Sequence, residues 1–158
     1  MSKSVKRVQR AAEALGLDIE IKRMGESTRT AEDAAAACDC DVSQIVKSLI
    51  SKGETSGDLV LLLVSGAHQV DLELAAGVVG EPLGRADATE VRTRTGFAIG
   101  GVSPIGHLEA PQMWMDESLL RHATVWAAAG APDAVFEIAP QVLADATGAK
   151  IAKLTREA

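Results

Sequence analysis

The six-residue run Leu59-Val60-Leu61-Leu62-Leu63-Val64 most limits how this chain can fold. A run of Leu and Val with no polar member is typical of a strand that is covered on both faces, so it predicts a central strand of a sheet. The run is too short to cross a bilayer, because a membrane-spanning helix needs about 20 apolar residues. The basic N-terminus is followed by no apolar segment and does not predict a secretory signal. We therefore expect a cytoplasmic protein, with no membrane partner, built around this strand.

Short segments of both kinds surround the central strand. Helical spacing and capping residues predict helices near residues 5–15, 30–38, 71–80, 87–95 and 140–147, with a further helical turn at 41–44. Apolar or alternating residues predict strands near 18–24, 45–50, 112–116, 124–128, 135–138 and 149–154. No regular alternation of strand and helix is visible, which disfavours a doubly wound sheet. We expect one compact α+β (mixed α/β) domain over residues 1–158, with a mixed, mostly antiparallel, curved or barrel-like sheet flanked by short helices.

Charge, Cys and His content limit the kinds of site. The net charge of −6 disfavours a protein that coats nucleic acid, since such binding neutralises many phosphates, but it allows a grip on one terminal nucleotide. Cys38 and Cys40 are too close in sequence for an unstrained disulfide, and the three His residues show no metal-binding spacing. We therefore expect reduced structural thiols, no metal and no cofactor.

Two sets of basic residues are candidates for contact with an anion. Lys47 lies in the apolar segment 45–50, where it either points outward from an edge strand or lines a cleft and binds a phosphate. One face of the first predicted helix forms either a solvated basic stripe or a contact with an RNA backbone, through Lys3, Lys6, Arg7 and Arg10.

The stretch Gly100-Gly101-Val102-Ser103-Pro104-Ile105-Gly106-His107, here called the glycine loop, is the third candidate. It is either a tight turn or a rigid wall whose backbone N–H groups face a substrate oxygen. Neither a phosphate-binding P-loop, nor a dinucleotide fingerprint, nor a G-x-S-x-G elbow is present. Ser103 would act as a nucleophile only if His107 reached it as a base. The small residues at 127–132 either leave room for a ligand or form a plain turn.

Six segments, taken in order, resemble the YbaK/ProX superfamily of aminoacyl-tRNA deacylases, which includes the editing insertion domain of bacterial prolyl-tRNA synthetases. They cover nearly the whole chain: residues 30–35, 44–49, 70–72, 95–96 with 100–106, 116–120 and 147–152. The most specific is the G-x-x-P motif that begins at Gly101 and ends at Pro104. The resemblance implies the fold of that superfamily.

The resemblance also implies a function. Such proteins hydrolyse the ester between a wrongly attached amino acid and the terminal ribose of tRNA, and we expect a small one here, such as Ala, Ser or Cys. The resemblance assigns the phosphate of the terminal adenosine to Lys47 and orientation of the aminoacyl carbonyl to the backbone from Gly101 to Pro104, while water attacks the ester. It places other residues against the substrate: Ser48, Gly100, Val102, Ser103, His107 and Gly130.

The implied partners are the aminoacylated 3′ end of tRNA and, as a second candidate, an aminoacyl-tRNA synthetase. The sequence shows no synthetase domain, so we expect editing in trans; the oligomeric state stays open between monomer and dimer. No side-chain general base is evident, and the 2′-hydroxyl of the substrate is often assigned part of that work in the family.

Two departures from the family pattern bear on specificity. Several relatives carry an acidic residue just after the segment that ends here in Gly130, whereas this chain has Ala134-Val135-Phe136-Glu137 there, so the pocket is expected to differ from that of Cys-tRNA-editing members. His107 replaces a more usual polar or apolar residue. The alternative functions are a non-catalytic module that binds nucleic acid or a nucleotide, and a factor that presents tRNA to a synthetase.

Overall fold

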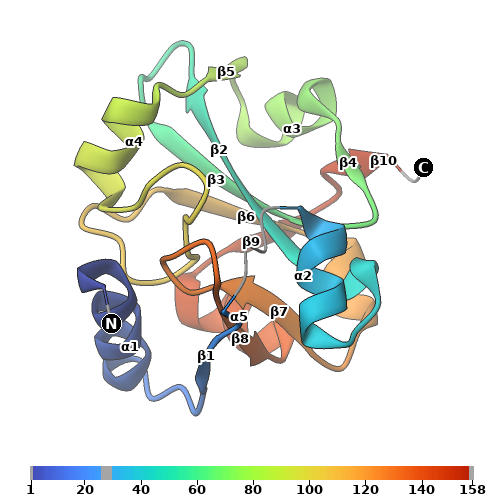
Figure 1. Cartoon of the computed structure of the whole chain (residues 1–158). Helices are drawn as coiled ribbons and strands as arrows, with labels where there is room; N and C mark the ends of the chain where they lie inside the picture. Colours follow the sequence, from blue (N-terminus) through green and yellow to red (C-terminus); the bar gives the residue numbers. More distant parts are fainter. Residues whose placement is uncertain (1, 26–29, 157–158) are drawn as a thin grey trace.

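The computed structural model describes residues 2–25 and 30–156 (Figure 1). Within them lie five α-helices: α1 (Lys3–Ala14), α2 (Ala31–Cys38), α3 (Leu72–Val79), α4 (Ala88–Thr95) and α5 (Pro140–Thr147). The same residues include two short 3-10 helices, η1 (Val42–Gln44) and η2 (Glu117–Arg121). The strands are β1 (Ile21–Arg23), β2 (Val46–Gly53), β3 (Leu59–Ser65), β4 (Gln69–Val70), β5 (Leu83–Arg85), β6 (Gln112–Asp116), β7 (Val125–Ala128), β8 (Ala134–Ile138), β9 (Lys150–Ala152) and β10 (Thr155–Arg156).

The strands form one larger and two smaller sheets. The five-stranded sheet has the order β5-β2-β3-β6-β9, the second sheet has the order β1-β8-β7, and β10 pairs with β4. Among the described strands, only the β3–β6 and β6–β9 pairs are parallel. A single parallel bridge between Ile45 and Trp126 brings the start of β2 beside β7. The prediction of a mixed, mostly antiparallel α+β domain is confirmed.

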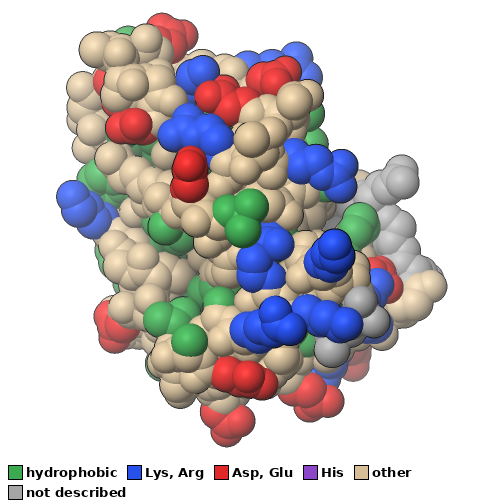
Figure 2. Space-filling model, turned by 90° about the vertical axis from the view of Figure 1, so that its left-hand side faces the viewer, with side chains coloured by type: hydrophobic (Ala, Val, Ile, Leu, Met, Phe, Trp, Pro, Cys, Tyr) green, Lys and Arg blue, Asp and Glu red, His purple; other side chains and the backbone are tan. Residues whose placement is uncertain are grey.

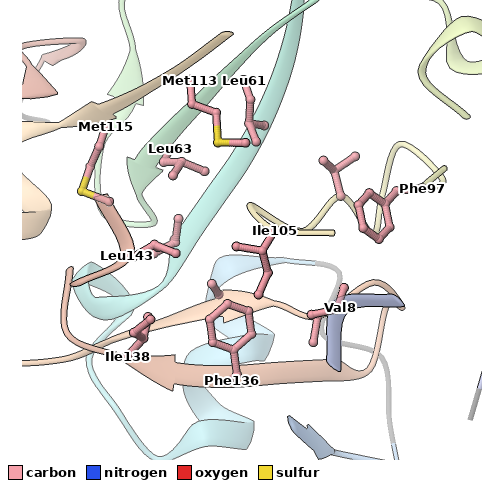
Figure 3. Packing of buried hydrophobic residues seen from close by; sticks show 14 of the residues in the cluster. Val8, Leu61, Leu63, Phe97, Ile105, Met113, Met115, Phe136, Ile138 and Leu143 are labelled. Atoms are coloured by element: carbon pink, nitrogen blue, oxygen red, sulfur yellow. The ribbon is translucent and has the colours of Figure 1, made fainter. Parts of the chain in front are cut away.

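The central strand predicted from the leucine and valine run is β3. All of its residues are buried, and successive side chains enter different clusters because they point to opposite faces of the sheet. Leu61 and Leu63 pack in the main core, whereas Leu62 packs in a second cluster that includes Ala75 of α3. Figure 3 shows Leu61 and Leu63 in the same core as Phe97 and Ile105, which flank and form part of the glycine loop.

Local capping chemistry sets most helix ends as predicted. The hydroxyl of Thr30 accepts a hydrogen bond from the Asp33 N–H, and Asp71 and Asp87 cap α3 and α4 in the same way. Gly96 follows α4 in the left-handed conformation that glycine adopts without strain. Among the described helices, none is long and apolar enough to cross a membrane.

Several strand bounds differ from those predicted. The strand expected over 18–24 is only β1, and β4, β5 and β10 were not predicted. Strands of two or three residues are too short to show a period-2 pattern, so they are recognised only by their hydrogen bonds to neighbouring strands. The same reason extends β2 to Gly53, since its last three residues pair with β5.

Candidate functional site

A cleft lies along the first half of β2. Strand β5 pairs only with Ser51–Gly53, so the edge of the preceding residues is left without that neighbour and faces α2, the glycine loop and β7 instead. The cavity has a volume of about 250 Å³. It is lined by Thr30, Ala31, Ala34, Ile45, Val46, Lys47, Ser48, Leu49, Ile99, Gly100, Val102 and Ala128.

Lys47 lies at this cleft and is half-buried. Its Nζ donates a hydrogen bond of 2.5 Å to the carbonyl oxygen of His68. Burial lowers the pKa of Lys47, and the Glu32 carboxylate opposes that shift. The strand therefore presents a partly desolvated cation in the cleft, which is the arrangement that attracts a phosphate.

Ser48 supplies an unused hydroxyl at the same place. Its Oγ is buried and has no hydrogen-bond partner in the part of the chain that the structure describes. A buried polar atom without a partner costs roughly 1–3 kcal/mol. The hydroxyl is enclosed, so a polar group in the cleft would bond to it only after a small movement of the surrounding residues.

The glycine loop forms the wall of the cleft through Gly100 and Val102. The Gly101 N–H is already engaged, since it donates to the Ala98 carbonyl oxygen at 2.8 Å. The N–H groups of Gly100, Val102 and Ser103 donate to no partner among the described residues. Pro104 has no N–H to offer. The loop is thus both a turn and a cleft wall, and its free donors flank Gly101 instead of lying on it.

Ser103 and His107 lie behind this wall and not among the cleft-lining residues. Ser103 is fully buried, and its Oγ accepts a hydrogen bond from the Ile105 N–H. His107 Nε2 lies 2.5 Å from the Ser103 carbonyl oxygen, so the imidazole meets the backbone of Ser103 and not its hydroxyl. Burial lowers the pKa of His107 to about 4, with the positive charge of Arg7 adding to the shift. A neutral His107 therefore supports the loop from behind.

A smaller cavity of about 60 Å³, here called the alcove, shares Ala34, Ile45, Val46, Gly100 and Ala128 with the cleft. Its remaining lining is apolar: Trp126, Ala127, Ala131, Pro132, Ala134 and Val135. Of the small residues at 127–132, several thus leave room for a ligand.

Gly130 belongs to neither cavity. Its φ is +96°, and its carbonyl oxygen accepts a 2.7 Å hydrogen bond from the Ser4 hydroxyl of α1. The structure therefore places Gly130 where α1 meets the end of β7.

The four cations of α1 are not equivalent. Figure 2 shows Lys and Arg side chains gathered on the face that includes α1. Lys3, Lys6 and Arg10 are exposed, but Arg7 is half-buried and reaches the glycine loop. Helical spacing put all four on one face and held no signal that separated Arg7 from the others.

Cys38 and Cys40 are free thiols, and both are half-buried. Burial, together with the charge of Cys40, raises the pKa of Cys38 to about 11. In the described ranges, no three metal-ligating side chains lie together.

The fold and the cleft define a small mixed α+β domain that places a lysine, an unpaired serine hydroxyl and free backbone donors around one cavity. Its sequence matches the profile of the aminoacyl-tRNA editing domain over residues 25–146, and the chain belongs to that family.

Three relatives add to this assignment. A solved structure described as "Crystal structure of a putative trans-editing enzyme for prolyl tRNA synthetase" is 46% identical, covers 99% of both chains and superposes with a TM-score of 0.92. YwhH of Bacillus subtilis (strain 168) is 32% identical over 133 residues, which are 84% of this chain and 83% of that protein. The "Putative Cys-tRNA(Pro)/Cys-tRNA(Cys) deacylase EbsC" of Enterococcus faecalis (strain ATCC 700802 / V583) is 24% identical over 131 residues, which are 82% of this chain and 79% of that protein.

Proposed function

We propose that this protein is a trans-editing deacylase that hydrolyses the ester of tRNA carrying a wrong, small amino acid. The observation that carries the proposal is that Lys47 lines one cleft with Gly100 and Val102, whose N–H groups have no partner among the described residues. Membership of the editing-domain family supports the reaction class, and the relative named for prolyl-tRNA synthetase supports action in trans.

Each cleft residue has a role in this reaction that follows from its chemistry. Lys47 binds the phosphate of the terminal adenosine, and Ser48 bonds to a polar group of the ribose or of the aminoacyl end. The N–H groups of Gly100 and Val102 hold the ester carbonyl oxygen, on which negative charge develops as water attacks. One such donor is worth about 3–4 kcal/mol in acyl transfer. Gly101 and Pro104 fix the shape of this wall.

The reaction then needs no nucleophile from the protein. Water adds to the carbonyl carbon, the tetrahedral intermediate expels the ribose oxygen, and that oxygen takes up a proton, with the neighbouring 2′-hydroxyl of the substrate as the carrier. The products are the free amino acid and uncharged tRNA. Ser103, His107 and Gly130 serve this reaction by shaping the wall and its surroundings.

The alcove receives the amino-acid side chain. Its volume of about 60 Å³ and apolar lining favour the methyl group of alanine. A serine hydroxyl would lose its hydrogen bonds to water there, at a cost of about 1–3 kcal/mol, or roughly 5- to 150-fold in rate. We therefore expect Ala-tRNA to be the best substrate, ahead of Ser-tRNA and of the Cys-tRNA that the name of the Enterococcus relative suggests.

A deacylation panel tests this function. Purified protein is incubated with Ala-, Ser-, Cys- and Pro-tRNA(Pro), and ester loss is compared with that in buffer. The expected result is fastest loss from Ala-tRNA(Pro). No loss above buffer from any substrate, with circular dichroism showing a folded protein, refutes the proposal. Binding of tRNA without ester loss would instead identify a tRNA-binding module.

Substitution of Lys47 tests its assigned role. Lys47→Met should raise KM about 10- to 100-fold, because a hydrogen bond to a charged group is worth roughly 1.5–3 kcal/mol. Lys47→Arg should restore part of the loss, since it keeps the charge. Lys153→Met removes an exposed lysine outside the cleft and serves as the matched control. Unchanged KM in Lys47→Met would show that the phosphate is bound elsewhere.

A further inference from the structure

One side chain of α1 bonds to both ends of the segment from Gly96 to Gly106, which contains most of the glycine loop. Arg7 Nε donates to the Gly106 carbonyl oxygen at 2.6 Å, and Arg7 Nη2 donates to the Gly96 carbonyl oxygen at 2.8 Å. The guanidinium carbon lies 4.7 Å from the centre of the Phe97 ring, so the cation also rests on an aromatic face. The nine residues between Gly96 and Gly106 include Ile99, Gly100 and Val102, which line the cleft.

The contacts continue from Arg7 toward that wall. The Phe97 ring meets the His107 ring edge-to-face with centroids 5.1 Å apart, and His107 Nε2 lies 2.5 Å from the Ser103 carbonyl oxygen. Phe97 is fully buried, so it cannot shift without disturbing the core. These contacts connect Arg7 to the backbone of Ser103, which follows the cleft-lining Val102.

The helix that carries Arg7 lies outside the residues that match the editing domain, since α1 is Lys3–Ala14 and the match begins at residue 25. The match thus contains the cleft wall but not the side chain that ties its two ends together. A guanidinium suits this task, because its planar fork can bond two separate carbonyls at once, whereas an ammonium is a point charge.

We propose that Arg7 is a positioning residue for deacylation, which holds the glycine loop so that the N–H groups of Gly100 and Val102 stay at the ester carbonyl. This inference rests on the proposed function. It also predicts a particular kinetic signature: substrate binding through Lys47 stays intact, and the chemical step slows.

The experiment uses Arg7→Ala and Arg7→Lys in the full chain, with Arg92→Ala as a control at an exposed arginine of α4. On the tRNA that the wild type deacylates fastest, both Arg7 variants should lose at least tenfold in kcat while KM changes less than threefold. Millimolar guanidinium should restore kcat at least fivefold in Arg7→Ala and leave Arg92→Ala unchanged. A wild-type kcat in Arg7→Ala, or a loss that is entirely in KM and is not rescued, would overturn the proposal.

Amide hydrogen exchange separates this proposal from the proposed function. The Gly101 and Leu108 amides are bonded to Ala98 and Thr95 within the loop region, and they should exchange at least tenfold faster in Arg7→Ala. If the wild type deacylates nothing, the deacylase assignment fails, and unchanged exchange in Arg7→Ala would overturn the role of Arg7 by itself. Arg7→Lys keeps the charge and most of the stem, so it gives the same readout if Arg7→Ala does not fold.

Discussion

Replacing Gly106 by Ala perturbs the one position of the glycine loop where the backbone requires glycine. Gly106 has a φ of +85°, and a Cβ there would lie 3.2 Å from the Val8 backbone and 3.3 Å from the Arg7 carbonyl oxygen. A left-handed conformation costs a non-glycine residue about 1–2 kcal/mol. The close contact adds to this cost, because the neighbouring atoms belong to the backbone of α1 and cannot rotate away. We therefore expect Gly106→Ala to destabilise the fold by about 2 kcal/mol, which lowers Tm by roughly 4–8 °C in a chain of this size.

Gly100 and Gly101 are matched controls in the same loop. A Cβ at Gly100 meets nothing within 4 Å, and a Cβ at Gly101 meets the Ala131 backbone at an ordinary 3.5 Å. Alanine at either position should shift stability by no more than about 0.5 kcal/mol. Gly100→Ala should still slow deacylation, since Gly100 lines both the cleft and the alcove. Differential scanning calorimetry of the three variants measures the stability changes, and a Tm of Gly106→Ala equal to that of Gly100→Ala would refute the reasoning.

Three further predictions concern titratable side chains whose pKa is shifted by the fold. Because burial lowers the pKa of His107 to about 4, the unfolded chain takes up this proton first as pH falls; stability should drop by about 2 kcal/mol between pH 7 and pH 5, and His107→Gln should reduce that slope in urea titrations. Asp116 is buried, and although burial raises its pKa, hydrogen bonds from Ser118 and from the Leu154 N–H lower it on balance; Asp116→Asn should cost about 1–3 kcal/mol in guanidinium unfolding at pH 7, and an unchanged midpoint would contradict this. With its pKa raised to about 11, Cys38 should react with a disulfide reagent at pH 8 roughly 100-fold more slowly than an unperturbed thiol, and a rate equal to that of free cysteine would show that the thiol is not protected.

Local chemistry explains which parts of the fold the sequence predicts. The caps at Thr30, Asp71 and Asp87 depend on one side chain and the N–H groups two or three residues later, so they can be read directly. The run that forms β3 is also predicted directly from the sequence, since burial on both faces leaves no polar residue in its apolar part. Strand β5 is different: it exists because the end of β2 offers it a partner, and its three residues carry no pattern of their own.

The candidate site also contains residues that the sequence predicts and residues that only the structure reveals. Lys47 stands out as a cation in an apolar run, and the structure places it at the cleft. Its neighbour Ser48 looks ordinary in sequence, and only the three-dimensional packing shows that its hydroxyl has no partner among the described residues. His107 is the opposite case, because a histidine in a glycine-rich loop suggests contact with substrate, yet its Nε2 faces the Ser103 carbonyl.

The support of the glycine loop shows why sequence patterns miss such residues. A loop with free N–H groups in its wall can use few of its own backbone bonds for support, because each N–H that is used for support, as at Gly101, is lost to the substrate. Donors outside the loop must therefore add support, and Arg7 supplies two hydrogen bonds from 89 and 99 residues away. Such long separations leave no local pattern, and helical spacing gave Arg7 the same rank as the exposed Arg10. In a cleft wall of this kind, side chains that donate to the loop carbonyls support the loop and leave its N–H groups free for the reaction. The three-dimensional structure is therefore needed to identify these side chains.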